Sequence, residues 1–292
     1  MANQSKRLDS NVPGNFYVDA TCINCDTCRQ LAPETFEEAG EYSAVAQQPR
    51  TDEQVLQAYQ ALLACPVGSI GAEHIDKRVV QQAKVGFPLQ LDEEVSYCGF
   101  NSEKSFGANS FFVRHPGGNW LVDSPRYVKH LVEAFGHMGG IAFIFLTHED
   151  DVADADLYAR HFGAIRIIHR ADAAAVPGAE WILEGEDSLE LRPQFTAIPV
   201  PGHTAGSQAL LYRDRFLFTG DHLWWEPGAQ RLGSPSRLVS DHEQQLQSIK
   251  KLLAYRFQWV LAGHGDRVCL SDEDMRAQLR SLIERRRPAA IC

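Results

Sequence analysis

Short runs of apolar residues recur through the second part of the chain and predict buried strands. One run covers residues 141–146, a mostly apolar one covers 258–262, and two shorter ones, 210–212 and 216–218, flank Asp214. Apolar segments separated by a few turn-forming residues are typical of hairpins, so the two shorter runs predict a hairpin that turns at Asp214. Continuous runs of this length predict strands that are covered on both faces.

Segments with apolar residues spaced three to four positions apart predict helices. A threonine and an acidic first turn open one such segment, and Ser271 followed by acids opens the last one. The predicted helical segments are residues 51–63, 126–138, 152–162, 240–256 and the segment that begins at 271. From Leu89 onward helices alternate with strands, which is typical of a layered α/β fold.

Histidines and aspartates follow where the predicted strands end. They are His148, Asp150, Asp151 and Asp154 after the run 141–146, His203 on a Pro-Gly turn, Asp221 after the hairpin, and His264 between two glycines after the last run. Any one of them alone is most simply a turn residue. Imidazoles and carboxylates gathered at several strand ends instead suit a borderline or hard divalent ion. The pattern therefore predicts a metal site.

Four of the seven cysteines form a separate pattern near the N-terminus. Cys22, Cys25 and Cys28 are spaced three residues apart, and Cys65 follows much later, before a proline. Three thiolates that converge from one loop suit a cubane iron-sulfur cluster. Zinc is the alternative, because four thiolates also make a tetrahedral zinc site. The odd total and the tight pattern favour a reducing compartment over a disulfide framework.

The composition excludes several classes of protein. Of the 292 residues, 44% are hydrophobic and 23% are charged, which is enough for one or two folded domains. A formal net charge of −10 argues against a nucleic-acid surface, and the apolar runs are too short to cross a membrane. The first residues show no apolar signal segment. We therefore expect a cytoplasmic protein that binds neither nucleic acid nor membrane.

The histidines and aspartates also occur in a characteristic order. Thr147-His148, Gly202-His203-Thr204, Thr219-Gly220-Asp221 and Gly263-His264-Gly265 follow one another in a way that resembles the metallo-β-lactamase superfamily over about residues 90–292. This resemblance implies an αββα sandwich. The chain departs from the family pattern because Asp150 stands where a second histidine is usual. Asp154 matches the next aspartate of the pattern only if two residues are inserted, and Ala155 then replaces a histidine.

The cysteine pattern resembles the single-cluster bacterial ferredoxins over roughly residues 14–80. Ala32 stands where a two-cluster ferredoxin has another cysteine, so the resemblance implies one 4Fe-4S cluster on the four cysteines. The expected fold class is α/β of the α+β type, a small ferredoxin-like domain followed by the sandwich. The expected regions are a flexible arm at 1–16, the ferredoxin-like domain at 17–80, a linker at 81–89 and the metallo-β-lactamase-like domain at 90–292.

The candidate ligands in the second domain favour iron. His148, His203 and Asp221 form a two-histidine, one-carboxylate set, which is a known iron geometry with open positions. Within the superfamily this set resembles that of persulfide dioxygenases, and the carboxylate Asp150 resembles the glutamate of flavodiiron proteins. With Asp150 and His264 as further ligands, we expect one iron, with zinc or manganese as alternatives.

Three hypotheses for function follow. The first is redox-linked iron chemistry on an unidentified small-molecule substrate, with an electron-donor protein as a partner, because the ferredoxin module supplies electrons. The second is a hydrolase of an ester, thioester or related bond, in which Asp151 or Asp154 orients a metal-bound water. In either enzyme His222 points into the cleft or braces a ligand. The third is a non-enzymatic iron-sulfur carrier or sensor.

Overall fold

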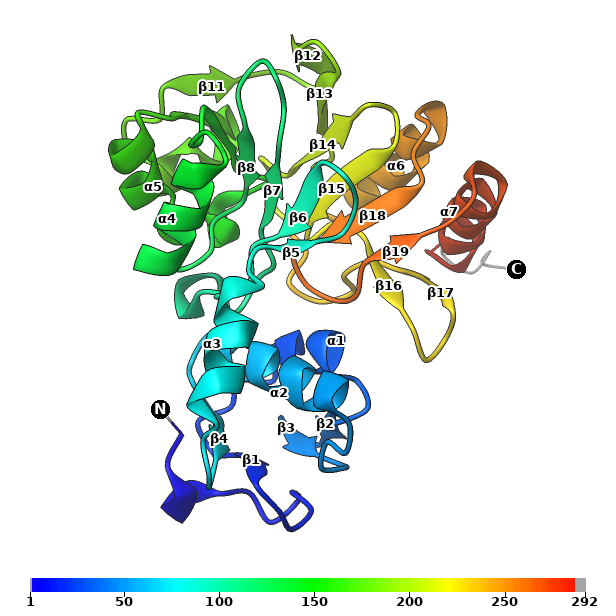
Figure 1. Cartoon of the computed structure of the whole chain (residues 1–292). Coiled ribbons are helices and arrows are strands. Elements are labelled where there is room, and N and C mark those ends of the chain that lie inside the picture. The colour runs from blue at the N-terminus through cyan, green and yellow to red at the C-terminus, as the bar shows by residue number, and fades with distance from the viewer. Residues whose placement is uncertain (1, 287–292) are drawn as a thin grey trace, which may run out of the picture. The chain divides into compact units, whose positions relative to one another are not determined.

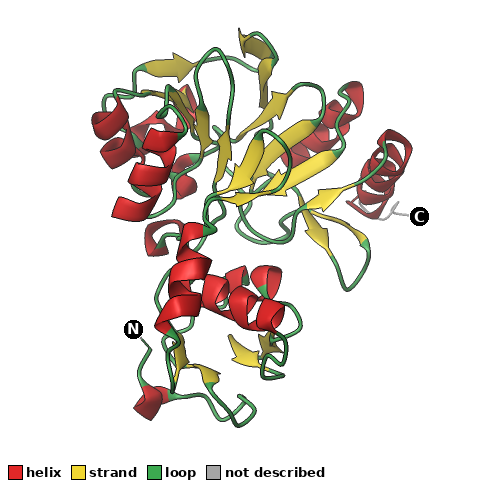
Figure 2. Cartoon of the chain, viewed as in Figure 1, coloured by secondary structure: helices red, strands yellow, loops and turns green. Residues whose placement is uncertain are grey.

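The computed structural model describes residues 2–286, so Met1 and residues 287–292, the outer ends of the predicted arm and second domain, lie outside the description. The chain divides into two compact units. The first contains the residues up to Ile144 together with Ala153–Ala164. The second contains Phe145–Val152 and the residues from Ile165 onward. Figure 1 follows the chain from blue to red, and Figure 2 separates helices from strands.

The first unit begins with the cysteine-bearing region. Its elements are η1 (Gln4–Lys6), β1 (Phe16–Val18), α1 (Thr27–Leu31), β2 (Phe36–Ala39), β3 (Tyr42–Val45), α2 (Asp52–Ala64), β4 (Ile70–Ala72) and α3 (Lys77–Val85). β1 pairs with β4 and β2 with β3, both antiparallel. Thr51 caps α2 as predicted, because its side chain accepts from the Gln54 N–H while the Gln54 side chain accepts from the Thr51 N–H.

The prediction of a flexible arm at residues 1–16 is wrong for the described residues. Asn11 is buried, and its Nδ2 donates to the carbonyl of Val18 at 2.9 Å. Its Oδ1 accepts from the N–H groups of Val18 at 2.9 Å and Val45 at 3.0 Å. One amide side chain therefore satisfies backbone groups from two strands and fastens the N-terminal segment to both.

The prediction of a linker at residues 81–89 is also wrong. Helix α3 continues to Val85, and Asp76 caps its start by accepting from the N–H groups of Arg78 and Val79. Phe87 is buried and packs edge-on against Tyr97 and Phe100, with ring centroids 6.3 and 5.3 Å apart. The polar residues that suggested a linker are the exposed face of α3.

The rest of the first unit carries antiparallel strands with two helices. Its elements are β5 (Leu89–Gln90), β6 (Val95–Tyr97), η2 (Glu103–Ser105), β7 (Phe111–Val113), β8 (Trp120–Val122), α4 (Lys129–His137) and α5 (Ala155–Phe162). β5, β6, β7 and β8 pair in chain order. Phe112 stacks on Phe135 of α4 at 4.7 Å, and Tyr158 of α5 meets the same ring edge-on at 5.8 Å, so both helices share one aromatic contact.

Strand β9 (Phe143–Phe145) is fully buried and leads into the second unit. The elements of that unit are η3 (Glu149–Asp151), β10 (Ile165–His169), η4 (Arg170–Ala175), β11 (Trp181–Leu183), β12 (Leu189–Arg192), β13 (Phe195–Pro199), β14 (Gln208–Tyr212), β15 (Phe216–Gly220), β16 (Trp224–Glu226), β17 (Arg231–Gly233), α6 (His242–Lys251), η5 (Leu252–Ala254), β18 (Trp259–Ala262), β19 (Val268–Cys269) and α7 (Asp272–Arg286).

A six-stranded sheet in the order β12-β13-β14-β15-β18-β19 forms the frame of the second unit. The predicted hairpin about Asp214 is confirmed as β14 and β15, with Arg213 and Asp214 at φ 56° and 48°, as a tight turn between twisted strands requires. β15 and β18 run parallel, whereas the other neighbours are antiparallel. The strand predictions therefore hold where the site is built.

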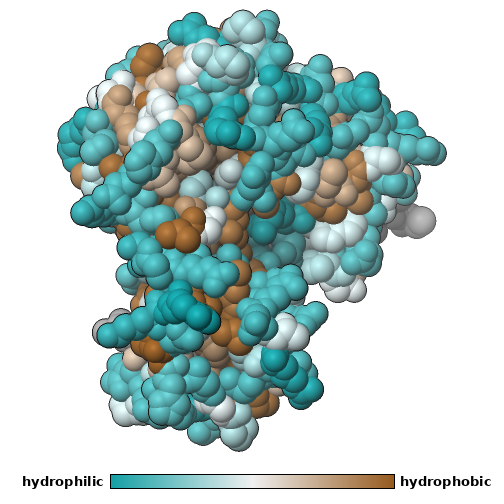
Figure 3. Space-filling model, in the orientation of Figure 1, coloured by the Kyte–Doolittle hydropathy of each residue, from teal (hydrophilic) through white to brown (hydrophobic). Residues whose placement is uncertain are grey.

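One apolar cluster stabilises this sheet. It joins Leu217 and Val260 of the strands to Ile249 of α6 and to Met275 and Leu279 of α7. On the face drawn in Figure 3, hydrophilic side chains in teal cover most of the surface. None of the helices in residues 2–286 combines the length and apolarity needed to cross a bilayer.

Candidate metal centre and cluster site

Two of the predicted ligands reach the same edge of the sheet because their strands are parallel. Gly220 at the end of β15 is in register with Ala262 at the end of β18, and the Gly263 N–H donates to the Gly220 carbonyl at 2.8 Å. Parallel strands end at one edge. The segments that follow the two strands therefore bring Asp221 and His264 together, and a carboxylate faces an imidazole across 3.9 Å.

His148 follows β9 and lies almost completely buried. Its Nδ1 is 3.0 Å from the Thr147 hydroxyl, in a hydrogen bond whose direction depends on the tautomer. Its Nε2 has no hydrogen-bonding partner among the described residues. The ring is therefore oriented by one nitrogen while the other is left for a ligand, which is how metal-binding histidines are usually held.

His203 lies on the predicted turn between β13 and β14. Its Nδ1 donates to the Leu238 carbonyl at 2.6 Å, since a carbonyl can only accept. In the neutral ring this assigns the lone pair to Nε2. The turn is held from outside as well, because the Ser240 hydroxyl donates to the Gly202 carbonyl at 2.8 Å. Ser240 therefore supports this turn, while Asp241 is the cap of α6.

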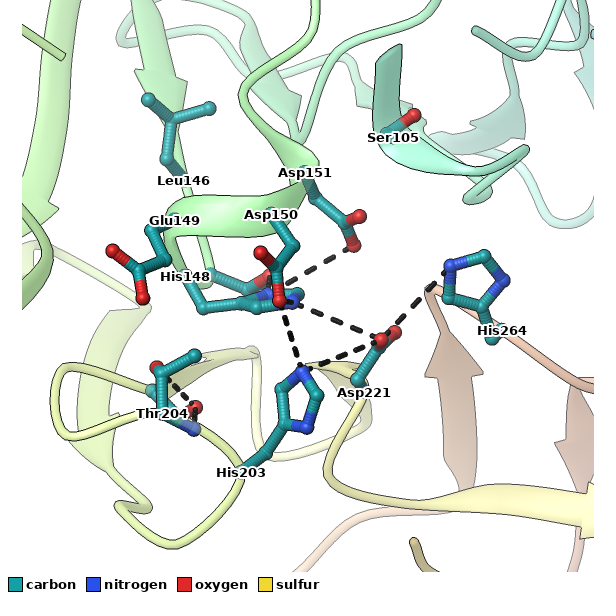
Figure 4. Close-up of polar contacts among 12 residues, drawn as sticks. Ser105, Leu146, His148, Glu149, Asp150, Asp151, His203, Thr204, Asp221 and His264 are labelled. Carbon is teal, nitrogen blue, oxygen red and sulfur yellow. Dashed lines mark hydrogen bonds and ion pairs between the residues drawn. The ribbon is translucent and has the colours of Figure 1, made fainter. Parts of the chain in front are cut away.

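Four side chains converge in the close-up of Figure 4. Asp221 Oδ2 lies 3.8 Å from His148 Nε2 and 3.6 Å from His203 Nε2. Asp150 Oδ2 lies 3.7 and 3.3 Å from the same two nitrogens. Ligand atoms of His148, His203 and Asp221 lie within 4.8 Å of one another, as a shared metal ion needs. Asp150 completes a set of two imidazoles and two carboxylates.

A second group of possible ligands shares Asp221. It consists of Asp151, Asp221 and His264, again with ligand atoms within 4.8 Å. A β-carbon on Gly263 would lie 2.7 Å from Asp151 Oδ2 and 2.8 Å from Asp221 Oδ1, so only glycine leaves room for both carboxylates. Asp221 is therefore the residue that joins two ligand groups.

The charges of the site tune its titrating groups. Burial lowers the pKa of His148, which favours the neutral form that binds metals. Burial also lowers the pKa of His203, but the neighbouring carboxylates Asp150 and Asp221 outweigh it and raise the pKa above its usual value. His203 in turn lowers the pKa of Asp150. The Asp150 carboxylate is thus held ionised beside the imidazoles.

The residues fit a divalent ion. His148 Nε2 and Asp221 Oδ1 are buried polar atoms that no hydrogen bond among the described residues satisfies, and such atoms are costly unless something binds them. Both face a set of nitrogen and oxygen donors without sulfur. That mixture suits iron, zinc or manganese.

Two candidates for catalysis belong to neither ligand group. Asp154 accepts from the Lys104 ammonium at 2.5 Å and from the Tyr127 N–H at 2.8 Å, so its carboxylate is engaged within the first unit. It is Asp151 that lies beside Asp221, because residues 149–151 form a 3₁₀ turn. His222 is buried and belongs to neither ligand group, and burial lowers its pKa to about 3.

Asp172 supports two of the ligand loops and was missed in the sequence. Its carboxylate accepts from the Thr204 hydroxyl at 2.6 Å and the Gly206 N–H at 2.9 Å, next to His203. It also accepts from the Glu149 N–H at 3.2 Å, next to His148. The sequence offers no signal for this role, since Asp172 stands in an alanine-rich segment after β10.

The cysteine site is a separate cavity in the first unit. It is lined by Cys22, Cys25, Cys28 and Cys65. The N–H groups of Asn24 and Ser43 both donate to Cys22 Sγ at 3.4 Å. Backbone N–H groups donate in the same way to the cysteine sulfurs of iron-sulfur clusters. Burial raises the pKa of Cys25 to about 12, so its thiolate needs a bound cation. The donor set fits a four-thiolate cluster.

Comparisons with known proteins find relatives of both parts of the chain. Residues 18–72 match the 4Fe-4S single cluster domain of Ferredoxin I. A hydroxyacylglutathione hydrolase from Acidiphilium cryptum (strain JF-5) is 32% identical over 119 residues, which are 39% of this chain and 49% of that protein. The match thus spans about half the length of the curated relative.

Solved structures show the same fold at low identity. DIM-1 metallo-β-lactamase aligns with 66% of this chain and 95% of its own at 15% identity, with a TM-score of 0.50. A metallo-β-lactamase family protein from Thermus thermophilus aligns with 67% of this chain and 80% of its own at 16% identity and a TM-score of 0.50. These likenesses confirm the predicted fold class. Since residues 89–284 also match the family model, the chain belongs to the metallo-β-lactamase superfamily.

Proposed function

We propose that the second domain is a metal-dependent hydrolase of an ester or thioester. The observation that carries this proposal is the sharing of Asp221 between two ligand groups. The sequence favoured a single redox iron because the usual histidine ligands of a second ion are absent. In the structure, Asp151 and His264 are candidate ligands for a second ion. This favours hydrolysis over redox chemistry.

A divalent ion held by His148, Asp150, His203 and Asp221 would supply a bound water of lowered pKa and a Lewis acid for a carbonyl oxygen. The chain itself contributes position and charge. His148 and His203 present Nε2 because their other nitrogens are hydrogen-bonded. Asp150 is the most exposed of these four residues, with 63% of its side chain exposed. Its ionised carboxylate can therefore accept a hydrogen bond from a water molecule that lies beside the substrate.

The curated relative suggests the first substrate to test. Its name describes hydrolysis of a hydroxyacylglutathione, which is a thioester. We extend this to the present chain only as a substrate class, because the match covers half of that protein. An S-hydroxyacylglutathione is therefore the first probe, with a simple carboxylic ester as the second.

Redox-linked iron chemistry is the second candidate, and the cysteine site favours it. A hydrolase makes no use of electrons from a four-thiolate cluster. An iron held by two histidines and a carboxylate can accept such electrons. An electron-donor protein would then be the partner. The two candidates differ in whether turnover needs the cysteines.

The test loads purified protein with zinc, manganese or iron and measures thioester and ester hydrolysis. We expect Asp221→Ala to abolish hydrolysis, Cys25→Ser to leave it intact, and the exposed control Asp187→Ala to match wild type. Hydrolysis that is absent from every metal-loaded form, together with dioxygen consumption that depends on iron and is lost in Cys25→Ser, would replace hydrolysis with the redox alternative.

A further inference from the structure

One cation reaches the cysteine site from outside the ferredoxin-like domain. Arg126 lies between β8 and α4, within the segment that matches the metallo-β-lactamase family. Its Nη2 donates to the carbonyls of Leu63 at 3.0 Å and Cys65 at 3.3 Å. Cys65 lines the cavity that the other three cysteines share. Within the first unit, the metallo-β-lactamase family segment thus supplies a positive charge to the backbone of a cluster ligand.

The C-terminal end of α2 explains why the Arg126 guanidinium binds beside Cys65. The last carbonyls of a helix lack partners within the helix and carry partial negative charge. Arg126 binds two carbonyls of this end, and the Asn101 N–H takes the Ala64 carbonyl between them at 3.1 Å. Both donors come from the same domain. They close the helix end directly before Cys65.

The backbone of Arg126 is fixed on several sides. Its N–H donates to the Phe100 carbonyl at 2.8 Å, and its carbonyl accepts from the Tyr158 hydroxyl at 2.8 Å. The next residue, Tyr127, donates its N–H to Asp154. A guanidinium on such a segment keeps its place, unlike a cation on a mobile surface side chain.

No carboxylate among the described residues pairs with this guanidinium. The residue is half-buried, and its Nε has no hydrogen-bonding partner in the described part of the chain. Its Nη2 is held against the backbone of Cys65 by the hydrogen bond to the Cys65 carbonyl. An arginine remains charged under these conditions. Its charge is therefore available to the cluster site.

We propose that Arg126 sets the reduction potential of the cluster held by Cys22, Cys25, Cys28 and Cys65. Reduction adds one electron from a low-potential donor and therefore one negative charge. A fixed cation near a ligand stabilises that charge, and it does so strongly where burial limits screening by water. Arg126 thus makes the reduced form easier to reach. The inference depends on the cluster and not on the proposed hydrolysis.

The reduction potential of the cluster therefore depends on residues from both family segments of the chain. The residues that match the ferredoxin family supply the thiolates, but the charge beside the fourth one comes from the metallo-β-lactamase family segment. A cluster in the first domain alone would be harder to reduce.

The test is an anaerobic redox titration of full-length protein with dithionite, followed by electron paramagnetic resonance of the reduced cluster. We expect Arg126→Gln to retain iron and sulfide but to shift the potential to more negative values. The ratio of reduced to oxidised cluster at a fixed potential should fall on the order of tenfold, which is about 59 mV for a one-electron couple. The exposed control Arg114→Gln should have the same cluster potential as wild type. The potential of Arg126→Lys should be close to that of wild type.

An unchanged potential in fully loaded Arg126→Gln would overturn the proposal. If Arg126→Gln does not retain the cluster, Arg126→Lys decides the matter. A loaded lysine variant with a potential near that of wild type supports the role of charge. A lysine variant that also loses its cluster shows that the arginine hydrogen bonds serve assembly only, and the proposal then fails.

Discussion

The cysteine site and the metal centre are assembled from the sequence in different ways. Three of the four thiols come from one short segment, Cys22–Cys28, so their spacing is enough to indicate the site. The metal centre draws His148, His203, Asp221 and His264 from the ends of four separate segments. The first kind of site is specified mainly by local spacing, whereas the second depends on how strands pair and turns close.

The two sites also differ in how their ligands are oriented. Backbone N–H groups of Asn24 and Ser43 point at a sulfur, which requires little from the rest of the fold. The imidazoles of His148 and His203 are instead turned by Thr147 and the Leu238 carbonyl. The orientation of the candidate metal ligands is thus set by residues that do not themselves bind the metal.

The largest expected effect separates the two sites. Cys25→Ser should remove the cluster completely, because three thiolates do not hold a cubane of this type firmly. The ion bound near His148 should remain. Iron, sulfide and total metal per chain measure both. Loss of both metals in this variant would mean that the sites are not independent.

A glycine tests the metal centre alone. Gly263→Ala places a methyl group against Asp151 and Asp221, so we expect metal affinity to fall by about 100-fold with the cluster unaffected. Gly228→Ala is the matched control, since a β-carbon there meets nothing within 4 Å. Competition with a chelator gives the affinities. Equal affinities in the two variants would show that the carboxylates are not ligands.

A buried amide tests how far the cysteine site depends on distant residues. Asn101 is fully buried, and its Nδ2 donates to the Thr27 hydroxyl at 3.1 Å and the Gly107 carbonyl at 2.7 Å. Asn101→Ala removes these two buried hydrogen bonds and the one that its Oδ1 accepts from the Tyr97 hydroxyl, which should cost about 1–3 kcal/mol. Urea unfolding measures it. An unchanged unfolding midpoint would show that the first domain stands without this support.

The smallest expected effect concerns the loops of the metal centre. Asp172→Asn keeps the shape of the side chain but exchanges one acceptor oxygen for a donor, so it cannot accept from Thr204, Gly206 and Glu149 together. We expect about tenfold weaker metal binding and a changed spectrum of a cobalt-loaded site. Asp187→Asn is the control. A spectrum identical to wild type would remove Asp172 from the account.

The comparison also explains what could be predicted from the sequence. The apolar runs correctly placed β9, β14, β15 and β18, and the segments after β9, β15 and β18 carry candidate ligands. The choice between Asp151 and Asp154 could not be made, because spacing does not reveal the 3₁₀ turn at residues 149–151.

Long-range contacts were hidden as well. Composition suggested a loose arm and a linker, but Asn11 and Phe87 use contacts far along the chain to order both. Asp172 likewise acts only through residues that the fold brings to it. Polar segments look alike in sequence whether or not one buried residue fastens them.

The two metal sites are tested most directly by anomalous X-ray scattering from anaerobically grown crystals of the full-length protein, measured at the iron and zinc absorption edges. We predict iron among Cys22, Cys25, Cys28 and Cys65, and a separate ion bound by His148, His203 and Asp221. Peaks at the cysteines alone, with Asp221 free of metal in crystals grown with excess zinc or iron, would contradict it.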